Sequence, residues 1–577
     1  MSSAEPSEQH PAPTTEPAPM RVGSGIDFSD PNSPLARFYF RTIHIVAAAV
    51  IVIVFVLCSF FPLWHTDVWG HLKYGEWMIQ NQRIPDREPF SPWWDGRQEF
   101  TQYYTITQAI MYWSYIAGER LAGGDEVQRM AGGIEMLRAL HGVLTAARFL
   151  FMLFAFVRIS KSWNLAVLGM FLMLFLDMSN IAVFRPQTFA QVFFAALLLP
   201  LSRDVLSKRS LILIPLLLVI WANSHGSYVV ALVVLSIVLA GRAIEAYLRE
   251  PRVWFWRDLG CQRLALVLVV SALAIAFGNP YGPDFYRRTF ALTQHPSLTG
   301  GVGEWKPLLF EWARGWHWIF MISVAVLALT QFFDRKRMPA DQLLLVLAFG
   351  IGCGLQTRFV IWWALLLPWV LIARWAQMFS TIPVNNERPN LRKTMLALLL
   401  GWAFLMWSGL AGWLTQGKPQ EVELAASSGT PWQLAMQLKH PGNEAFAYYP
   451  ELAEILKKHY PYGRYTGSIM ATPMQGDYLL WALAPDIPVT YAHIHLFHPD
   501  YWAEIGIVGQ GRPGWWEILD KYSVNMIVVE AEFSKLLREQ LQKSPGWKIL
   551  VDETGDVQKK PNDLTRHLIA VRLEPMQ

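Results

Sequence analysis

The sequence predicts a mostly α-helical, polytopic membrane protein that carries a small α/β domain at its C-terminus. Hydrophobic residues make up 53% of the 577 residues, charged residues only 16%, and the mean hydropathy is +0.24. A chain of this composition folds with lipid as its main solvent. The net charge of +4 is too small to indicate a nucleic-acid partner, so we expect none.

Residues 1–38 are expected to form a disordered cytoplasmic tail. They are rich in Pro, Ser, Glu and Thr and contain no apolar signal-peptide region. Such a segment cannot bury enough apolar surface to fold.

Residues 39–415 contain eleven apolar runs of the length that crosses a bilayer. As one helix, the stretch 210–244 would be about 50 Å long, too long for a hydrocarbon core of about 30 Å. We therefore divide it at a turn over Asn223–Gly226. The runs are 43–63, 136–157, 163–183, 187–202, 210–222, 226–244, 262–278, 316–333, 341–355, 359–377 and 395–414.

The distribution of Lys and Arg orients these spans. By the positive-inside rule, the side that collects the basic loop residues is cytoplasmic. The N-terminus is therefore expected inside, and everything after about residue 415 outside. The basic residues of that side are Arg37, Arg41, Arg158, Lys161, Arg203, Lys208, Arg209, Arg242, Arg249, Arg252, Arg257, Arg335, Lys336, Arg337, Arg388, Arg392 and Lys393.

The outer side is expected to hold two long loops, about 64–135 and 279–315, and residues 416–577. In the first loop, Val68, Leu72, Gly75 and Ile79 form an apolar stripe at helical spacing. This stripe predicts a helix that lies in the membrane interface.

Residues 416–577 are expected to fold as an extracytoplasmic α/β domain. The segments 522–530 and 566–572 have the composition of strands, and 532–543 has the pattern of a helix.

Polar residues at the ends of the spans are expected to meet at the outer level of the bundle. An ionisable side chain beside hydrocarbon is costly unless it has a function. A cavity lined by acidic, basic and amide groups at this level suits a substrate with a phosphate among the headgroups and a polyprenyl chain in lipid. The residues are Asp67, His71, Arg185, Gln187, Asn223, His225, Asn279, Glu304 and Arg358.

Short segments around these residues resemble the C-type (GT-C) membrane glycosyltransferases, in particular a bacterial branch of GT-C-like proteins. The resemblance covers roughly residues 40–415 and includes an acid that opens a large outer loop after the first span. One departure is that many members have two adjacent acids where this chain has Asp67 alone. The segments are Asp67–Leu72, Gly75–Glu76, Arg83–Asp86, Pro89–Ser91, Arg185–Gln187, Trp221–Gly226, Asn279–Gly282 and Glu304–Pro307.

The resemblance implies a glycosyltransferase of a bacterial cytoplasmic membrane that uses a polyprenyl-phosphate sugar and an acceptor on the outer face. Asp67 would be the general base, and His71 would orient it or bind phosphate. Arg185 and Arg358 would stabilise the leaving phosphate, and Glu304 would bind the acceptor or a divalent metal ion. Further substrate-binding residues would be Gln187, Asn223, His225 and Asn279.

Each assignment has a structural alternative. Asp67 could cap the following helix, His71 could be a hydrogen-bond partner within the fold, and Arg185 could extend towards lipid headgroups. The same two interpretations stay open for Arg358 and His225, and Asn279 begins a segment with turn composition.

Two other functions are compatible with the sequence. One is a transporter or flippase for a lipid-linked substrate, in which the cavity binds without making bonds. The other is a catalytically inactive scaffold in envelope assembly, which the lone acid at position 67 favours. In the C-terminal domain, the alternating histidines of the segment Tyr491–His498 could bind zinc from one strand face, but no nearby cysteine or paired acid completes such a site.

Overall fold

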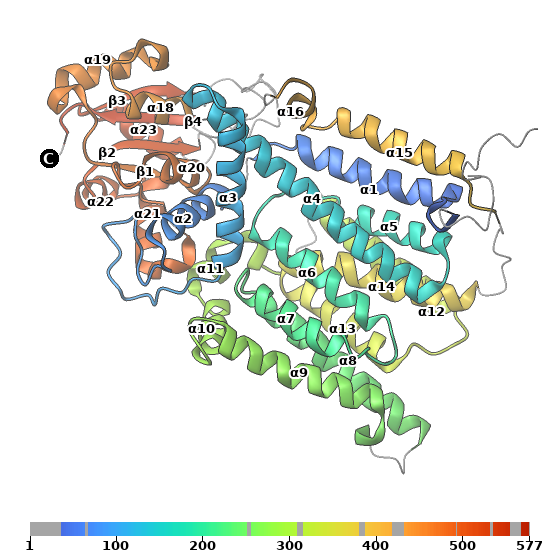
Figure 1. Cartoon of the computed structure of the whole chain (residues 1–577). Helices are drawn as coiled ribbons and strands as arrows, with labels where there is room; N and C mark the ends of the chain where they lie inside the picture. The colour runs from blue at the N-terminus through green and yellow to red at the C-terminus, as the bar shows by residue number, and fades with distance from the viewer. Residues whose placement is uncertain are drawn as a thin grey trace, which may run out of the picture.

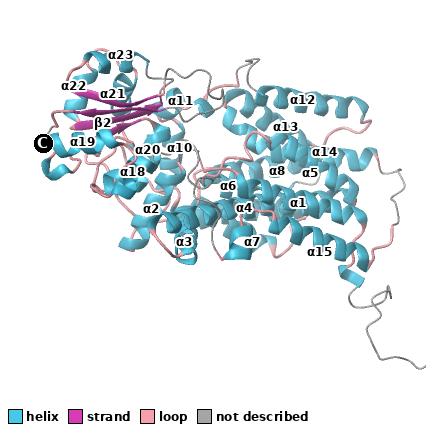
Figure 2. Ribbon diagram, turned by 90° about the horizontal axis from the view of Figure 1, so that it is seen from above, coloured by secondary structure: helices cyan, strands magenta, loops and turns pink. Residues whose placement is uncertain are grey.

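The structure is a computed structural model that describes residues 36–63, 67–250, 255–308, 315–379, 387–417, 432–491, 493–530, 535–553 and 567–575. A bundle of apolar helices carries a small sheet domain against one end (Figure 1). Helices flank the sheet of that domain (Figure 2). The expected tail lies outside the described residues except for a short 3-10 helix, Ala36–Phe38.

Each of the eleven expected spans contains a helix, and the turn that divides 210–244 is present. Among the described residues, five helical segments are long and apolar enough to cross a membrane: α1, α4, α8, α9 and Thr357–Met378. The chain is a multi-pass membrane protein, and the predicted fold class is confirmed. The bundle helices are α1 Thr42–Phe60, α4 Glu126–Ser160, α5 Trp163–Asp177, α6 Pro186–Leu201, α7 Ser210–Ala222, α8 Tyr228–Arg249, α9 Leu259–Gly278, α12 Gly315–Phe333, α13 Ala340–Leu355, α14 Val360–Met378 and α15 Leu391–Met406.

Helix α4 begins ten residues before the span expected at 136–157. The Asp125 side chain accepts a hydrogen bond from the Gln128 backbone N–H at 2.8 Å, and Glu126 stands in the first turn. Both features stabilise a helix N-terminus. With 35 residues, α4 is about 52 Å long and therefore extends beyond the bilayer, where it packs against α3 (Thr105–Ala122).

Buried ion pairs hold the bundle together at positions that the hydropathy pattern did not reveal. Arg148 of α4 pairs with Asp177 at the end of α5, with 2.5 Å between Nη2 and Oδ2, and both side chains are 2% exposed. Arg374 of α14 pairs with Asp334. Removing one partner of such a pair is strongly destabilising, because it leaves an uncompensated buried charge.

The helix expected in the membrane interface is α2, Val68–Asn81, and its surroundings differ from that expectation. Val68 and Leu72 are fully buried, and α2 packs between α3 and α20 (Pro473–Leu483) of the C-terminal domain. A Cβ on Gly75 would lie 2.3 Å from the Gln108 carbonyl oxygen of α3. The apolar stripe is therefore covered by protein.

The C-terminal domain contains a four-stranded mixed sheet of order β1-β2-β4-β3. Strand β1 is parallel to β2, whereas β4 is antiparallel to both β2 and β3. The segments expected as strands become β2 and β4, and the expected helix becomes α23; β1 and β3 were not predicted. The elements are α18 Trp432–Lys439, α19 Pro450–His459, β1 Ser468–Ala471, α21 Pro499–Gly509, α22 Trp515–Lys521, β2 Val524–Glu530, α23 Lys535–Lys543, β3 Trp547–Asp552 and β4 His567–Arg572.

This domain and the long loop over residues 64–135 share one hydrophobic core. Leu72, Tyr115 and Ile134 of helices α2, α3 and α4 belong to the same buried cluster as Leu479 and Ile527 of the sheet domain. The loop and the C-terminal domain, which are far apart in sequence, therefore form one layer at the end of the bundle. This layer positions the candidate site.

Candidate functional site

A polar cavity of about 310 Å³ lies where the helix bundle meets the C-terminal domain. Seven of the nine residues singled out from the sequence line it, although they come from five separate segments of the chain. They are Asp67, His71, Arg185, Gln187, His225, Glu304 and Arg358.

Asp67 immediately precedes α2 and does not cap it. Its backbone adopts the left-handed conformation (φ 86°, ψ −24°), which is costly for a residue other than glycine. Its side chain accepts no hydrogen bond from the N-terminus of α2. The helix-cap alternative is therefore wrong, and the carboxylate faces the cavity beside the Tyr491 hydroxyl and the His493 ring.

The cap of α2 comes instead from Asp477 of the C-terminal domain. Its two carboxylate oxygens accept the backbone N–H groups of Trp69 and Gly70, each at 2.8 Å. Asp477 is fully buried; burial, together with the neighbouring Asp67 carboxylate, raises its pKa. A Cβ on Gly70 would lie 2.6 Å from Asp477 Oδ1, so glycine allows this close approach without a shift of the Asp477 side chain.

His71 lies one turn after Asp67, within a group of rings. Gln108 of α3 donates its amide N–H to His71 Nδ1 at 2.8 Å. The His71 ring centroid is 4.3 Å from that of His493 and 4.5 Å from that of Tyr104. Burial, and then the neighbouring histidines, hold the pKa of His71 well below its usual range, so the ring is neutral at pH 7.

Arg185 and Arg358 differ in how their charges are balanced. Arg185 Nη1 lies 2.6 Å from Glu304 Oε1. Arg358 stacks over the Trp305 ring at 5.2 Å, and within the described part of the chain it has no carboxylate partner. Because a buried or half-buried cation needs an anion, Arg358 is the group in this cavity best placed to receive one from a ligand.

Gln187, in the first turn of α6, is 2% exposed, and neither its amide N–H nor its amide oxygen has a partner among the described residues. Buried amides are normally hydrogen-bonded. The side chain therefore offers both a donor and an acceptor to a ligand in the cavity.

Asn223 and Asn279 do not line the cavity, contrary to the sequence-based expectation. Asn279 donates its amide N–H to Asn223 Oδ1 at 3.1 Å, and Asn223 donates to the Gly278 carbonyl at 3.0 Å. The two amides thus tie the α7–α8 turn to the end of α9. Their hydrogen-bonding groups serve the backbone of the turns, which is the physical reason why they do not face a ligand.

The C-terminal domain supplies cavity residues that sequence reasoning did not assign to this site. His493, His495, Tyr491 and Trp502 line it together with Asp67. The alternating histidines of 491–498 were the only local signal, and nothing in them specified which part of the bundle they would meet. In the described ranges, no group of three or more His, Cys, Asp or Glu side chains is arranged to hold a metal ion.

The neutral histidines make this region sensitive to acid. Burial lowers the pKa of His71, His493 and His495 below the ordinary 6.5. Above pH 6.5 these rings are neutral in the folded and the unfolded chain, so their contribution to stability is complete. As pH falls below 6.5, the unfolded chain takes up protons that the folded chain refuses, and stability falls by up to about 1.4 kcal/mol per pH unit per histidine.

We therefore expect the thermal unfolding temperature of the purified protein to fall between pH 7.5 and 5.5. The His493→Gln variant should show a shallower dependence on pH. An identical slope in the two proteins would contradict this account.

An apolar cavity of about 650 Å³ adjoins the polar one. The two cavities share six residues: Tyr104, His225, Leu298, Trp305, Arg358 and His495. The remaining walls are mainly apolar side chains of α8, α10 (Asp284–Thr293) and α13, among them Phe290, which is 65% exposed at the edge of the bundle. A polar compartment and an apolar compartment with an exposed apolar edge therefore meet at Arg358.

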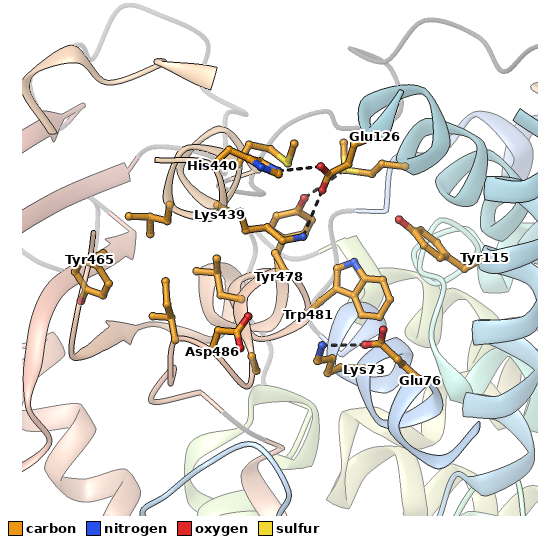
Figure 3. A pocket seen from close by; sticks show the side chains of 18 of the residues that line it. Lys73, Glu76, Tyr115, Glu126, Lys439, His440, Tyr465, Tyr478, Trp481 and Asp486 are labelled. Carbon is orange, nitrogen blue, oxygen red and sulfur yellow. Dashed lines mark hydrogen bonds and ion pairs between the residues drawn. The ribbon is translucent and has the colours of Figure 1, made fainter. Parts of the chain in front are cut away.

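A third cavity, of about 700 Å³, lies on the other side of α2 (Figure 3). Two ion pairs lie in its wall: Lys73 Nζ lies 2.8 Å from Glu76 Oε2, and His440 Nε2 lies 2.8 Å from Glu126 Oε2. Helix α2 packs against α20 between this cavity and Asp67, and the hydrogen bonds from α2 to Asp477 hold the two helices together. We therefore do not include it in the candidate site.

Comparisons with known proteins define the fold. No protein-family model and no curated protein matches the chain. The apo form of the oligosaccharyltransferase of Archaeoglobus fulgidus matches with a TM-score of 0.50 and 13% identity, over 85% of this chain and 69% of that chain. The same enzyme in complex with zinc and sulfate gives 0.50 and 14%, over 85% and 68%.

ArnT of Cupriavidus metallidurans, bound to undecaprenyl phosphate, matches over 92% of this chain and 99% of that chain, with 12% identity and a TM-score of 0.43. Identities this low concern the fold alone. The match to the oligosaccharyltransferase confirms the resemblance that the sequence indicated: this chain has the fold of the GT-C membrane glycosyltransferases.

Proposed function

We propose that the protein is a glycosyltransferase that moves a sugar from a polyprenyl-phosphate donor to an acceptor, on the side of the membrane that carries the C-terminal domain. The observation that carries this proposal is the junction at Arg358 of a polar cavity containing Asp67 with an apolar cavity whose edge is formed by exposed apolar side chains such as Phe290. A donor with a charged head and a long apolar chain needs both compartments at once.

The donor phosphate is assigned to Arg358. A guanidinium is always charged and matches phosphate oxygens in pairs, and Arg358 lacks a carboxylate partner in the described structure. Arg185 would assist from the same cavity, with Glu304 holding it in place through their ion pair. The polyprenyl chain would follow the apolar cavity past Phe290 towards the membrane.

Asp67 is assigned as the general base. It would take the proton from an acceptor hydroxyl while that oxygen attacks the anomeric carbon from the face opposite the phosphate. The bond from the anomeric carbon to the phosphate oxygen breaks, and polyprenyl phosphate leaves with the electron pair, stabilised by Arg358 and Arg185. His71 and Gln187 would hold the sugar or the acceptor through hydrogen bonds.

The orientation follows from loop charge. We propose a cytoplasmic N-terminus and an extracytoplasmic C-terminal domain in a bacterial cytoplasmic membrane. A reporter that is active only outside the cytoplasm should be active after Gln577 and inactive after Lys336. The reverse pattern would place the polar cavity in the cytoplasm and remove the proposed acceptor side.

Lipid binding tests the donor assignment. Mass spectrometry of the purified protein should detect a co-purified polyprenyl phosphate. The Arg358→Lys variant should bind added polyprenyl phosphate about tenfold more weakly than wild type, because lysine keeps the charge but loses the paired hydrogen-bond geometry. Arg335→Lys is a matched control, since Arg335 is exposed at the other end of the bundle. Equal affinities in the two variants would refute the role of Arg358.

The two alternative functions give other results. A flippase would bind the lipid yet release no sugar to any acceptor, and an inactive scaffold would retain neither lipid nor transfer activity.

A further inference from the structure

A basic groove lies at the end of the bundle opposite the polar cavity. We define it by Arg158, Arg203, Lys208 and Arg209, which line a cavity of about 750 Å³ between the ends of α4 and α6 and the start of α7. None of the described residues that line it carries a carboxylate. The groove therefore concentrates positive charge without an internal counterion.

The floor of the basic groove is apolar and reaches the outside of the bundle. Phe151 of α4, Leu199 of α6, and Leu213 and Leu217 of α7 contribute to it. Leu213 is 60% exposed, so the floor continues onto the surface that faces lipid. A ligand can thus enter from the side while its head stays among the cations.

The direction of the helices places the basic groove on the other side of the membrane from Asp67. Helix α6 begins after Arg185, in the polar cavity, and ends 16 residues later at Leu201, beside the groove. At the rise of an α-helix these ends are about 24 Å apart. The groove is therefore independent of the function proposed for the polar cavity.

Some other basic residues at this end of the bundle have carboxylate partners, whereas those of the groove have none among the described residues. Arg337 lies 2.6 Å from Glu245, and Arg242 lies 3.8 Å from Asp341. In the groove, Arg158 donates to the Leu199 carbonyl at 2.7 Å, and its charge is repelled by that of Arg203. Within the described residues, Arg203, Lys208 and Arg209 form no ion pair.

The simplest interpretation of basic span ends is that each one extends separately to the headgroups. The groove differs because its cations surround one concave site whose volume lies in the range of ligand pockets. Basic pockets between membrane helices bind the phosphates of acidic lipids. Free phosphate would use the cations but not the apolar floor.

We propose that the basic groove binds one molecule of an anionic membrane phospholipid. Its phosphate lies among Arg158, Arg203, Lys208 and Arg209, and an acyl chain lies along Leu213. The bound lipid supplies the negative charge that the lining of the groove lacks.

The test uses the full-length protein, purified and stripped of lipid, with phosphatidylglycerol and phosphatidylcholine as probes. Native mass spectrometry should show one phosphatidylglycerol bound at least tenfold more tightly than phosphatidylcholine. The triple variant Arg203→Gln, Lys208→Gln, Arg209→Gln should weaken that binding by about 10²-fold at low salt. The variant Arg249→Gln, Arg335→Gln, Lys336→Gln removes the same charge elsewhere at this end and should bind as wild type does.

Three results would overturn the proposal: equal binding of the two lipids, equal losses in the two triple variants, or displacement of phosphatidylglycerol by millimolar inorganic phosphate, which would mark a site for free anions. If the groove variant does not fold, the single variant Arg203→Gln and the salt dependence of wild-type binding replace it. Binding of phosphatidylglycerol that does not weaken with added salt would contradict the proposal. Arg358→Lys should leave phosphatidylglycerol binding unchanged, which separates this site from the proposed donor site.

Discussion

The Asp67→Asn variant is expected to fold normally and to lose sugar transfer by about 10²–10⁴-fold, the usual contribution of a positioned general base. Asparagine keeps the shape of the side chain and its ability to accept a hydrogen bond, but it cannot take a proton. Because Asp67 does not cap α2, the substitution removes no helix cap. The measurement is transfer of labelled sugar from a polyprenyl-phosphate donor, together with the unfolding temperature.

Glu76→Gln is the matched control for this experiment. Glu76 lies on the same helix but pairs with Lys73 in the cavity on the other side of α2. The Glu76→Gln variant should therefore retain nearly full sugar-transfer activity. An Asp67→Asn protein that is as active as wild type would sink the assignment of the base and favour the flippase or the scaffold.

The Asp477→Ala variant is expected to lose both stability and activity. Two buried backbone N–H groups at the start of α2 would lose their acceptor, and buried donors without an acceptor cost about 1–3 kcal/mol. Since Asp67 immediately precedes this helix, its carboxylate would shift, and a displacement of about 1 Å costs roughly 10²-fold in rate. Unfolding temperature and sugar transfer should fall together.

Two further variants sharpen this result. Asp477→Asn keeps one acceptor oxygen and should be less unstable than Asp477→Ala, whereas Asp486→Ala alters an exposed acid of the same domain and should have little effect. If the Asp477→Ala variant has the unfolding temperature and the sugar-transfer activity of wild type, the C-terminal domain does not position Asp67.

The helices of the bundle could be predicted because lipid imposes a local rule on the sequence. A segment that crosses a bilayer must be apolar over about 20 residues, and its polar ends must alternate between the two sides. For this reason Arg185, His225, Glu304 and Arg358 could be placed at one level without knowledge of how the helices pack. The turn at Asn223 followed from the same rule.

The same rule could not say which of these side chains face a ligand. Asn223 and Asn279 stand at the expected level but bond to each other and to backbone carbonyls. Arg185 is balanced by Glu304, whereas Arg358 has no carboxylate partner in the described part of the chain. Such differences arise from rotamers and helix packing, which leave no pattern in the sequence.

The sequence by itself determined the membrane-spanning helices, the polar level at their ends and the candidate acid, Asp67, because each is encoded within a few neighbouring residues. Only the tertiary structure decided that the C-terminal domain helps to build the site. Asp477 caps α2 from a position 408 residues away from Trp69, and His493 and His495 complete the wall around Asp67. Contacts across such a separation depend on the packing of two surfaces, and no local periodicity specifies them.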